Sequence, residues 1–343
     1  MNMTISNPIH TGRKLRRRRW AAATALLTIL TATLCVAMLL LGNTTYPIET
    51  VVRVLLGEDI GGASFAVKTL RLPRMLAGLF AGFAFGIAGS TFQTLLRNPL
   101  ASPNIIGISS GSSAAAVFCI LVLHTSGAVV SVAAVIAGLL TTALIYALSS
   151  AGSFSGGRLI LIGIGMQAML GALVSYLLLG ASSYDVPAAL RWLSGSLNGI
   201  RLSDTPVLML SVTLLSPVIL LLGSRLRILE LGEQSATALG VNTNKTRVAL
   251  VLSAVCLIAL ATATTGPIAL VSFLAGPIAK RLVGAGFSSE LPAGLMGAVL
   301  VLGADLLGQF AFGTRFPVGV ITGMLGAPFL LFLLIRMNRT GGL

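Results

Sequence analysis

The chain has 343 residues, of which 55% are hydrophobic and only 9% are charged, and its mean hydropathy is +0.97. Soluble domains carry roughly 25% charged residues, so this composition excludes a water-soluble globular protein. The formal net charge of +14 would indicate nucleic-acid binding only on a recognition surface, and no such fold or aromatic platform accompanies it.

The chain begins with a basic segment, residues 1–20, that contains the block Arg13–Arg19. We interpret this segment as a cytoplasmic tail that orients the protein by the positive-inside rule, with no nucleic-acid partner. The apolar run 21–42 follows it and is longer than the core of a signal peptide, about 7–15 residues. We therefore expect a retained first helix rather than a cleaved signal.

Ten apolar segments follow one another along the chain. A helix crosses the hydrocarbon core of a bilayer with about 20 residues, and strict alternation, which a barrel strand would need, is absent. The sequence therefore predicts an all-α, polytopic membrane protein, with residues 21–343 forming a single transmembrane domain. The predicted spans are 21–42, 74–95, 105–123, 127–148, 158–180, 205–223, 247–265, 268–283, 291–312 and 317–336.

The basic residues indicate how these spans are oriented. With the N-terminus in the cytoplasm, most of the 23 Lys and Arg residues fall on the cytoplasmic side, as the positive-inside rule requires. An even number of crossings then returns the C-terminus to the same side. We expect a multi-pass protein of the cytoplasmic (inner) membrane, with both termini in the cytoplasm.

The cytoplasmic loop 223–246 carries the densest mixture of charge after the N-terminus. Within it, small and apolar residues recur every three or four positions from Leu229 to Leu239, while Glu230 and Glu233 occupy another face. This spacing predicts a short amphipathic helix that fits a groove of a soluble partner. The alternative, a helix lying on lipid, is weaker because the two acids disfavour an anionic membrane.

The order of the spans suggests an internal duplication. Helices two to five and seven to ten form two blocks that enter the membrane from opposite sides. Segments rich in proline and glycine interrupt both blocks: Arg97–Pro103 in the first, and Gly266-Pro267 and Gly276-Pro277 in the second. Inverted repeats with broken helices are typical of transporters.

Catalytic and metal-binding patterns are missing from the sequence. It contains no phosphate-binding loop, its histidines His10 and His124 have no suitably spaced partner, and its three cysteines lie in apolar runs at unrelated spacing. We expect no enzyme, no metal site and no cofactor. An ion-coupled secondary carrier would need ionisable groups inside the membrane. The spans offer one carboxylate, Asp305, with few partners nearby, which we interpret as a helix–helix hydrogen bond.

Four sequence motifs occur in order along the chain: Arg71-Leu72-Pro73-Arg74; Gln93 to Gly107, with Arg97-Asn98-Pro99; Leu231 to Val241; and Phe316 to Thr322, with Pro317 and Gly319; Gly266-Pro267 accompanies them. Together they resemble one family, the FecCD/BtuC-type permeases of ABC importers for iron–siderophore complexes and cobalamin. The likeness runs from about residue 50 to the C-terminus, and the stretch Trp192–Gly199 resembles ferric-enterobactin permeases of the G type. One departure stands at Ala275–Arg281, where the family usually reads Ala-Pro-His-Ile-Ala-Arg-Arg and this chain lacks the histidine.

The resemblance implies a set of partners and a mechanism. Two permease subunits, sister chains or two copies, would enclose a path lined mainly by helices five and ten. An ABC ATPase pair would lie beneath them, and an extracytoplasmic substrate-binding protein would deliver the cargo. The mechanism would be alternating access. The expected cargo is a ferric siderophore, first a catecholate, with cobalamin or haem as alternatives.

The same resemblance assigns roles to residues of this chain. Guanidinium groups pair with carboxylates in two-pronged fashion, so the arginines at external helix ends become candidates for docking the binding protein, with interfacial snorkelling as the alternative. The expected ATPase-coupling residues are Leu229, Glu230, Gly232, Glu233, Ala236, Leu239 and Gly240; the docking residues are Arg71, Arg74 and Arg315; the inner gate is Ser155, Gly156, Gly157 and Arg158.

Overall fold

A computed structural model describes residues 8–99, 101–102, 107–149, 156–284 and 286–339, and the regular structure of these residues is helical throughout. Each predicted span coincides with one helix, which confirms the all-α polytopic fold. These helices are α1 (Pro8–Leu40), α4 (Leu72–Leu95), α5 (Ile108–Leu121), α6 (Ala128–Ser149), α7 (Gly156–Leu179), α9 (Pro206–Glu230), α11 (Thr243–Thr265), α12 (Val271–Val283), α13 (Glu290–Phe310) and α14 (Val318–Arg339).

The helices differ in length. Within the described residues, seven helical segments are long and apolar enough to cross a membrane, whereas the apolar parts of α5 and α14 are shorter. The helix α12 has only 13 residues. The helices α5 and α12 both begin after the start of their predicted spans, because a motif precedes each of them. The segment after Arg97 precedes α5, and Gly266-Pro267 separates α11 from α12. The inverted repeat stays a prediction.

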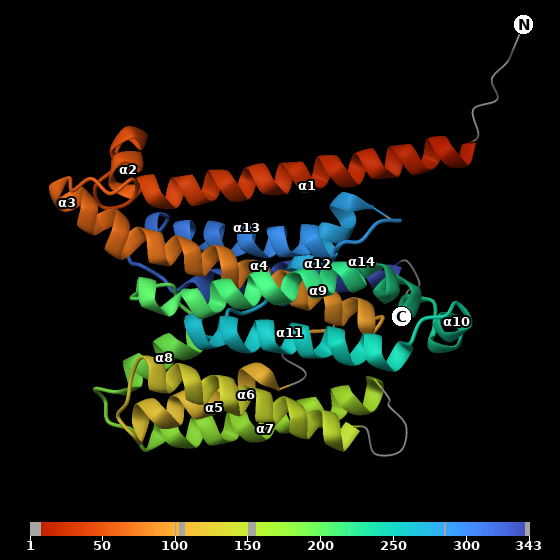
Figure 1. The fold of residues 1–343 in the computed structure, drawn as a ribbon. Coiled ribbons are helices and arrows are strands. Elements are labelled where there is room, and N and C mark those ends of the chain that lie inside the picture. Colours follow the sequence, from red (N-terminus) through yellow and green to blue (C-terminus); the bar gives the residue numbers. More distant parts are fainter. Residues whose placement is uncertain (1–7, 100, 103–106, 150–155, 285, 340–343) are drawn as a thin grey trace, which may run out of the picture.

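The long helices lie side by side, with α1 along one edge of the bundle and α7 along another (Figure 1). The short helices α2 (Ile48–Leu55), α3 (Gly61–Ser64) and α8 (Val186–Ser194) gather at one end, here called the α8 end. The short helix α10 (Glu233–Ala238) lies at the other, here called the α10 end. The first turn of α1 and the last turn of α14 are also at the α10 end, as an even number of crossings requires.

Glycine allows α4 to occupy the centre of the bundle. A Cβ atom on Gly86 would lie 2.1 Å from the carbonyl oxygen of Ala293, and one on Gly82 would lie 2.6 Å from that of Gly297. The backbones of α4 and α13 therefore touch directly, which is how small residues pack helices in lipid. In the most apolar stretch of α4, 78% of the residues are buried, against 11% for α7.

Two segments outside the predicted spans are helical. Residues 8–20, expected as a tail, continue α1 as helix, because no proline or glycine pair interrupts them and because Arg19 bonds to the end of α12 and Trp20 to the α12–α13 connection. The connection after Tyr46 is helical in large part. It contains α2, α3 and a π-helix (Phe65–Arg71) that runs directly into α4.

Candidate functional site

The candidate ATPase-coupling segment, residues 229–241, lies at the α10 end. The prediction of one amphipathic helix over this segment is wrong. The helix α9 continues through Glu230, and Gly232 then adopts a φ of 120°, a conformation that glycine reaches without steric cost. The helix α10 after this break has six residues, Glu233–Ala238, and Gly240 follows it with a φ of 79°.

The apolar side chains of the coupling segment divide into two groups. Leu229 and Ala236 are buried together with Val241, and they pack against Leu95 at the end of α4. Leu231 and Leu239, by contrast, are 67% and 62% exposed. The buried group fixes the segment to the bundle, and the exposed group is available to a partner.

Polar contacts hold the coupling segment from three sides. Glu230 pairs with Lys280 of α12 at 3.1 Å, and Glu233 pairs with Arg247 of α11 at 3.0 Å. Arg97, in a left-handed conformation with a φ of 50°, donates a hydrogen bond of 2.9 Å to the carbonyl oxygen of Leu229. The structure thus joins the Arg97-Asn98-Pro99 motif to the coupling segment, although the two are far apart in sequence.

Within the same motif, the Asn98 amide donates to the carbonyl oxygen of Gln93 at 3.0 Å, and Pro99 is exposed. Gln93 itself is buried and donates from Nε2 to the carbonyl oxygen of Phe273 at 2.9 Å. A Cβ atom on Gly276 would lie 2.1 Å from Gln93 Oε1. The departure from the family pattern at Gly276 therefore leaves the space that the Gln93 side chain fills.

The three docking candidates lie near the α8 end, but their guanidinium groups are in different situations. Arg71 donates to the carbonyl oxygens of Leu39 and Leu40 at 2.9 Å each, and so satisfies the last turn of α1. It also lies 5.0 Å from the centre of the Tyr46 ring. Arg315 is exposed and donates to the side-chain oxygen of Asn43.

Arg74 is bound inside the protein. Its Nε and Nη2 atoms donate to the two carboxylate oxygens of Asp305 at 2.7 Å each, and Nη1 donates to Asn198 Oδ1 at 2.5 Å. Gln309 adds a third hydrogen bond to Asp305, at 2.8 Å. The prediction that Asp305 joins two helices is confirmed, and the expectation that it has few partners nearby is wrong.

Three motifs that are distant in sequence meet at the α8 end, in what we call the motif joint: Ser194–Ser196, Thr265–Pro267 and Gly319. The Ser196 amide donates to the carbonyl oxygen of Thr265 at 2.7 Å, and the Gly319 amide donates to that of Gly195 at 3.1 Å. A Cβ atom on Gly319 would lie 1.8 Å from the carbonyl oxygen of Ser194. The joint depends on direct contact between backbones. Pro317 stands two residues before Gly319 and immediately precedes α14.

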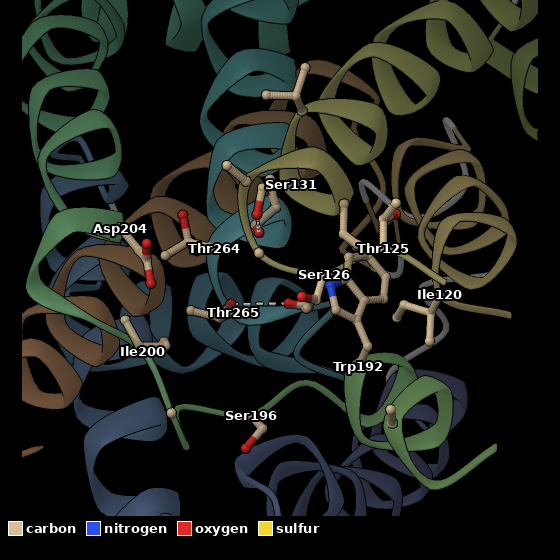
Figure 2. Close-up of a pocket in the computed structure, with 18 of the residues that line it drawn as sticks. Ile120, Thr125, Ser126, Ser131, Trp192, Ser196, Ile200, Asp204, Thr264 and Thr265 are labelled. Carbon is tan, nitrogen blue, oxygen red and sulfur yellow. Dashed lines mark hydrogen bonds between the residues drawn. The ribbon is translucent and has the colours of Figure 1, made fainter. Parts of the chain in front are cut away.

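A cavity of about 870 Å³ opens at the α8 end, between the α5–α6 connection, α6, α8 and the last turn of α11 (Figure 2). In Figure 2 the Trp192 ring lies beside Ile120 and Thr125. The hydroxyl groups of Ser131 and Thr264 donate to backbone carbonyls, so they offer acceptors rather than donors. Charges of both signs line the cavity: Arg191, Asp185 and Asp204.

The expected path along α7 and α14 does not coincide with this cavity, whose lining contains no residue of either helix. Of the gate candidates, Ser155 lies outside the described residues, Gly156 and Gly157 begin α7, and Arg158 is exposed. The gate stays a prediction. Among the described residues, no group of three or more His, Cys, Asp or Glu side chains could hold a metal ion.

A bundle of membrane-length helices, with an exposed apolar segment at the α10 end, is typical of a transport permease. The model of the FecCD transport family matches residues 27–336. The chain therefore belongs to the FecCD transport family, and the resemblance of the motifs is confirmed. It is a permease subunit rather than an enzyme, and ATP hydrolysis belongs to a separate subunit.

Individual relatives agree with this assignment. The chain is 36% identical to the ferric enterobactin transport system permease protein FepG of Escherichia coli, over 87% of this chain and 91% of that protein. It is 39% identical to the achromobactin transport system permease protein CbrC of Dickeya dadantii, over 84% of each chain. Among solved structures, an inward-facing metal-chelate type ABC transporter matches with a TM-score of 0.82 and 27% identity, over 92% of this chain and 100% of that chain.

Proposed function

We propose that this chain is the membrane permease of an ATP-driven importer that carries a ferric siderophore, of the catecholate type, across the cytoplasmic membrane. The observation that carries the proposal is the likeness to the ferric enterobactin permease over 87% of the chain. The stretch Trp192–Gly199, which resembles ferric-enterobactin permeases of the G type, also supports it, because Trp192, Ser196 and Asn198 line the cavity at the α8 end. Cobalamin or haem is the alternative cargo.

The exposed surfaces of α7 and α14 support a second permease subunit. On α7, large apolar side chains such as Leu161 and Met169 are 72% and 60% exposed, and Met324 on α14 is 61% exposed. A path lined by these two helices would be open on one side in a single chain. A sister permease or a second copy would close it, and the likeness to a G-type permease favours the sister.

The two ends of the bundle would bind different soluble partners. At the α10 end, Leu231 and Leu239 would enter a groove of the ATPase, while Leu229 and Ala236 carry the motion into α9 and α4. At the α8 end, Arg315 is the exposed one of the three docking candidates and would receive a carboxylate of the binding protein. Arg71 and Arg74 would need to exchange internal partners before they could take that role.

The mechanism we propose is alternating access. ATP binding in the partner subunits would draw the coupling segments together and open the path toward the α8 end. Residues 155–158 would form the inner gate, where two glycines permit backbone rearrangement. The α10 end would face the cytoplasm, since most of the basic residues lie there.

The proposal is tested by reconstituting the chain in vesicles with the ATPase, the second permease and the binding protein that co-purify with it. We expect ATP-dependent uptake of a radioactive ferric catecholate in preference to ferric citrate, haem or cobalamin. Preference for cobalamin or haem would contradict the proposed cargo while leaving the importer in place. Uptake driven by an ion gradient without ATP would instead establish a secondary carrier.

A further inference from the structure

The helix α1 is longer than a membrane crossing requires. Its 33 residues span about 50 Å at 1.5 Å per residue, whereas the hydrocarbon core is about 30 Å thick. The excess lies at the α10 end, where α1 extends past its neighbours (Figure 1). The residues of this extension include Arg13, Lys14, Arg17 and Arg18, here called the basic turn pair.

The boundary between the apolar part of α1 and the basic turn pair is marked by a tryptophan. Trp20 Nε1 donates to the carbonyl oxygen of Ser288 at 2.8 Å, and its ring centre lies 6.3 Å from that of Phe287. Tryptophan with one apolar side and one hydrogen-bonding atom is typical of the membrane–water interface. We therefore take Trp20 as the level at which α1 leaves the hydrocarbon.

A neighbouring arginine fixes the extension to the bundle. Arg19 donates to the carbonyl oxygens of Arg281 and Leu282 at 2.7 and 2.9 Å, the last carbonyls of α12 that point toward the α10 end. A cation at a helix C-terminus also stabilises the helix dipole. The basic turn pair is therefore held in one position relative to α12 and α13, rather than swinging as a free tail.

The four cations of the basic turn pair are exposed, and within the described part of the chain none of them makes a hydrogen bond or an ion pair. The described sequence of α1 contains no Asp or Glu. At 1.5 Å per residue, Arg17 lies about 4 Å and Arg13 about 10 Å beyond Trp20 along the helix axis. These positions fall in the headgroup layer or within about one Debye length of it.

We propose that the basic turn pair is a binding surface for the headgroups of anionic phospholipids in the leaflet at the α10 end. Clusters of four or more cations directly beside a membrane-spanning helix bind such headgroups. Below Trp20 the same helix exposes large apolar side chains, Leu26 and Ile29 among them, so one molecule of lipid can contact both regions. The surface of α1 thus offers apolar side chains to the acyl chains of a lipid and, next to them, cations to its headgroup.

A protein partner explains the position of the basic turn pair less well. The helix α1 packs on α13, α12 and α4, whereas α10 packs on α9 and α11. The cations are thus carried by different helices from those that hold the proposed ATPase-coupling segment. In addition, only 22% of the most apolar stretch of α1 is buried, which leaves this helix at the lipid-facing edge of the chain.

The experiment uses the two tryptophans of the chain, Trp20 and Trp192, which lie at opposite ends. In a Trp192→Phe variant, the fluorescence of Trp20 reports the lipids around the basic turn pair. The full chain is reconstituted with brominated phosphatidylglycerol or brominated phosphatidylcholine as the quencher. We expect a higher relative binding constant for the anionic lipid, reduced by salt, and about fivefold lower for each cation changed to glutamine.

A control variant and a set of single substitutions make the result specific. A Trp20→Phe variant reports from Trp192 at the α8 end, where we expect the four glutamine substitutions R13Q, K14Q, R17Q and R18Q to change nothing. If this quadruple variant fails to insert, the single variants R17Q and R18Q carry the test, each with an expected fivefold loss. Equal quenching of Trp20 by both lipids in the parent, or an unchanged preference after the substitutions, would overturn the proposal.

Discussion

Arg74 on α4 and Asp305 on α13 are 231 positions apart in sequence, and their side chains form a two-pronged ion pair with both hydrogen bonds at 2.7 Å. The exposed fractions of the two side chains are 14% and 1%. A buried pair of this kind is costly to break from one side, because the remaining charge keeps its desolvation penalty without its partner. The pair therefore ties the central helix to its closest neighbour.

We predict that Asp305→Ala destabilises the protein by about 3–5 kcal/mol, measured by thermal or denaturant unfolding in detergent. Replacing both partners, as in Arg74→Met with Asp305→Leu, removes the unpaired charge and should cost much less than the sum of the single changes. Additive single effects, within about 0.5 kcal/mol, would contradict an energetic coupling between the two side chains.

The contact between α4 and α13 gives a second prediction. Gly86→Ala places a methyl group 2.1 Å from the Ala293 carbonyl oxygen, and overpacking of this kind costs typically about 1–3 kcal/mol. Gly303 lies on the same helix as Gly297, and a Cβ atom there would meet nothing within 4 Å. Gly303→Ala is therefore the matched control. It should leave the unfolding temperature unchanged or raise it.

The altered family motif gives a third prediction. Gly276→Ala should destabilise the chain because the new methyl group overlaps the Gln93 side chain. In a Gln93→Ala background that overlap is gone, so the second substitution should cost less there. Unfolding measurements on the four proteins of this double-mutant cycle give the coupling, and a coupling of zero would show that Gly276 serves another purpose.

The coupling segment contains an exposed leucine, Leu239, and a buried leucine, Leu229, whose substitutions should have different effects. Leu239→Asp should abolish the stimulation of ATPase activity while the unfolding temperature stays within error, because this side chain is exposed. Leu229→Asp buries a charge and should instead lower the stability of the permease itself. The comparison requires both readouts on the reconstituted complex. Normal ATPase stimulation in the Leu239 variant would show that this residue does not contact the ATPase.

The three arginines near the α8 end, Arg71, Arg74 and Arg315, differ in the same way. Arg315→Glu should weaken association with the binding protein in a salt-sensitive manner and leave the fold intact, because the side chain is exposed. Arg71→Glu and Arg74→Glu should lower the unfolding temperature, since they remove the bonds to α1 and to Asp305. Titration of the binding protein at two salt concentrations, with an unfolding scan of each variant, separates these effects.

The ten spans could be predicted because membrane-length apolar runs carry their own signal, independent of neighbours. The end of α9 could not, since the 3- and 4-residue spacing from Leu229 to Leu239 persists across Gly232, and only the backbone conformation reveals the break. The helical extension before Ala21 could not be predicted either, because its sequence is basic rather than apolar. Part of its stability comes from contacts with residues 281–288, which the sequence does not reveal.

The roles of single side chains were harder to predict than the helices. Arg71 and Arg74 were expected at a helix end, but they lie where the π-helix runs on into α4. Which partner an arginine takes depends on how two helices rotate against each other. Nothing near Arg74 in sequence indicates Asp305. The motifs were recognised as separate signatures, whereas their contacts with one another, such as Arg97 with the carbonyl oxygen of Leu229, exist only in the folded bundle.

The motif joint has a consequence for how this transporter can diversify. Its contacts run from main chain to main chain, so they say nothing about cargo, while the neighbouring wall at Thr125, Arg191 and Asp204 is made of replaceable side chains. Those side chains can be exchanged without disturbing the backbone contacts that join α8, α11 and α14. The lining of the cavity can therefore diversify while the fold at this end is kept.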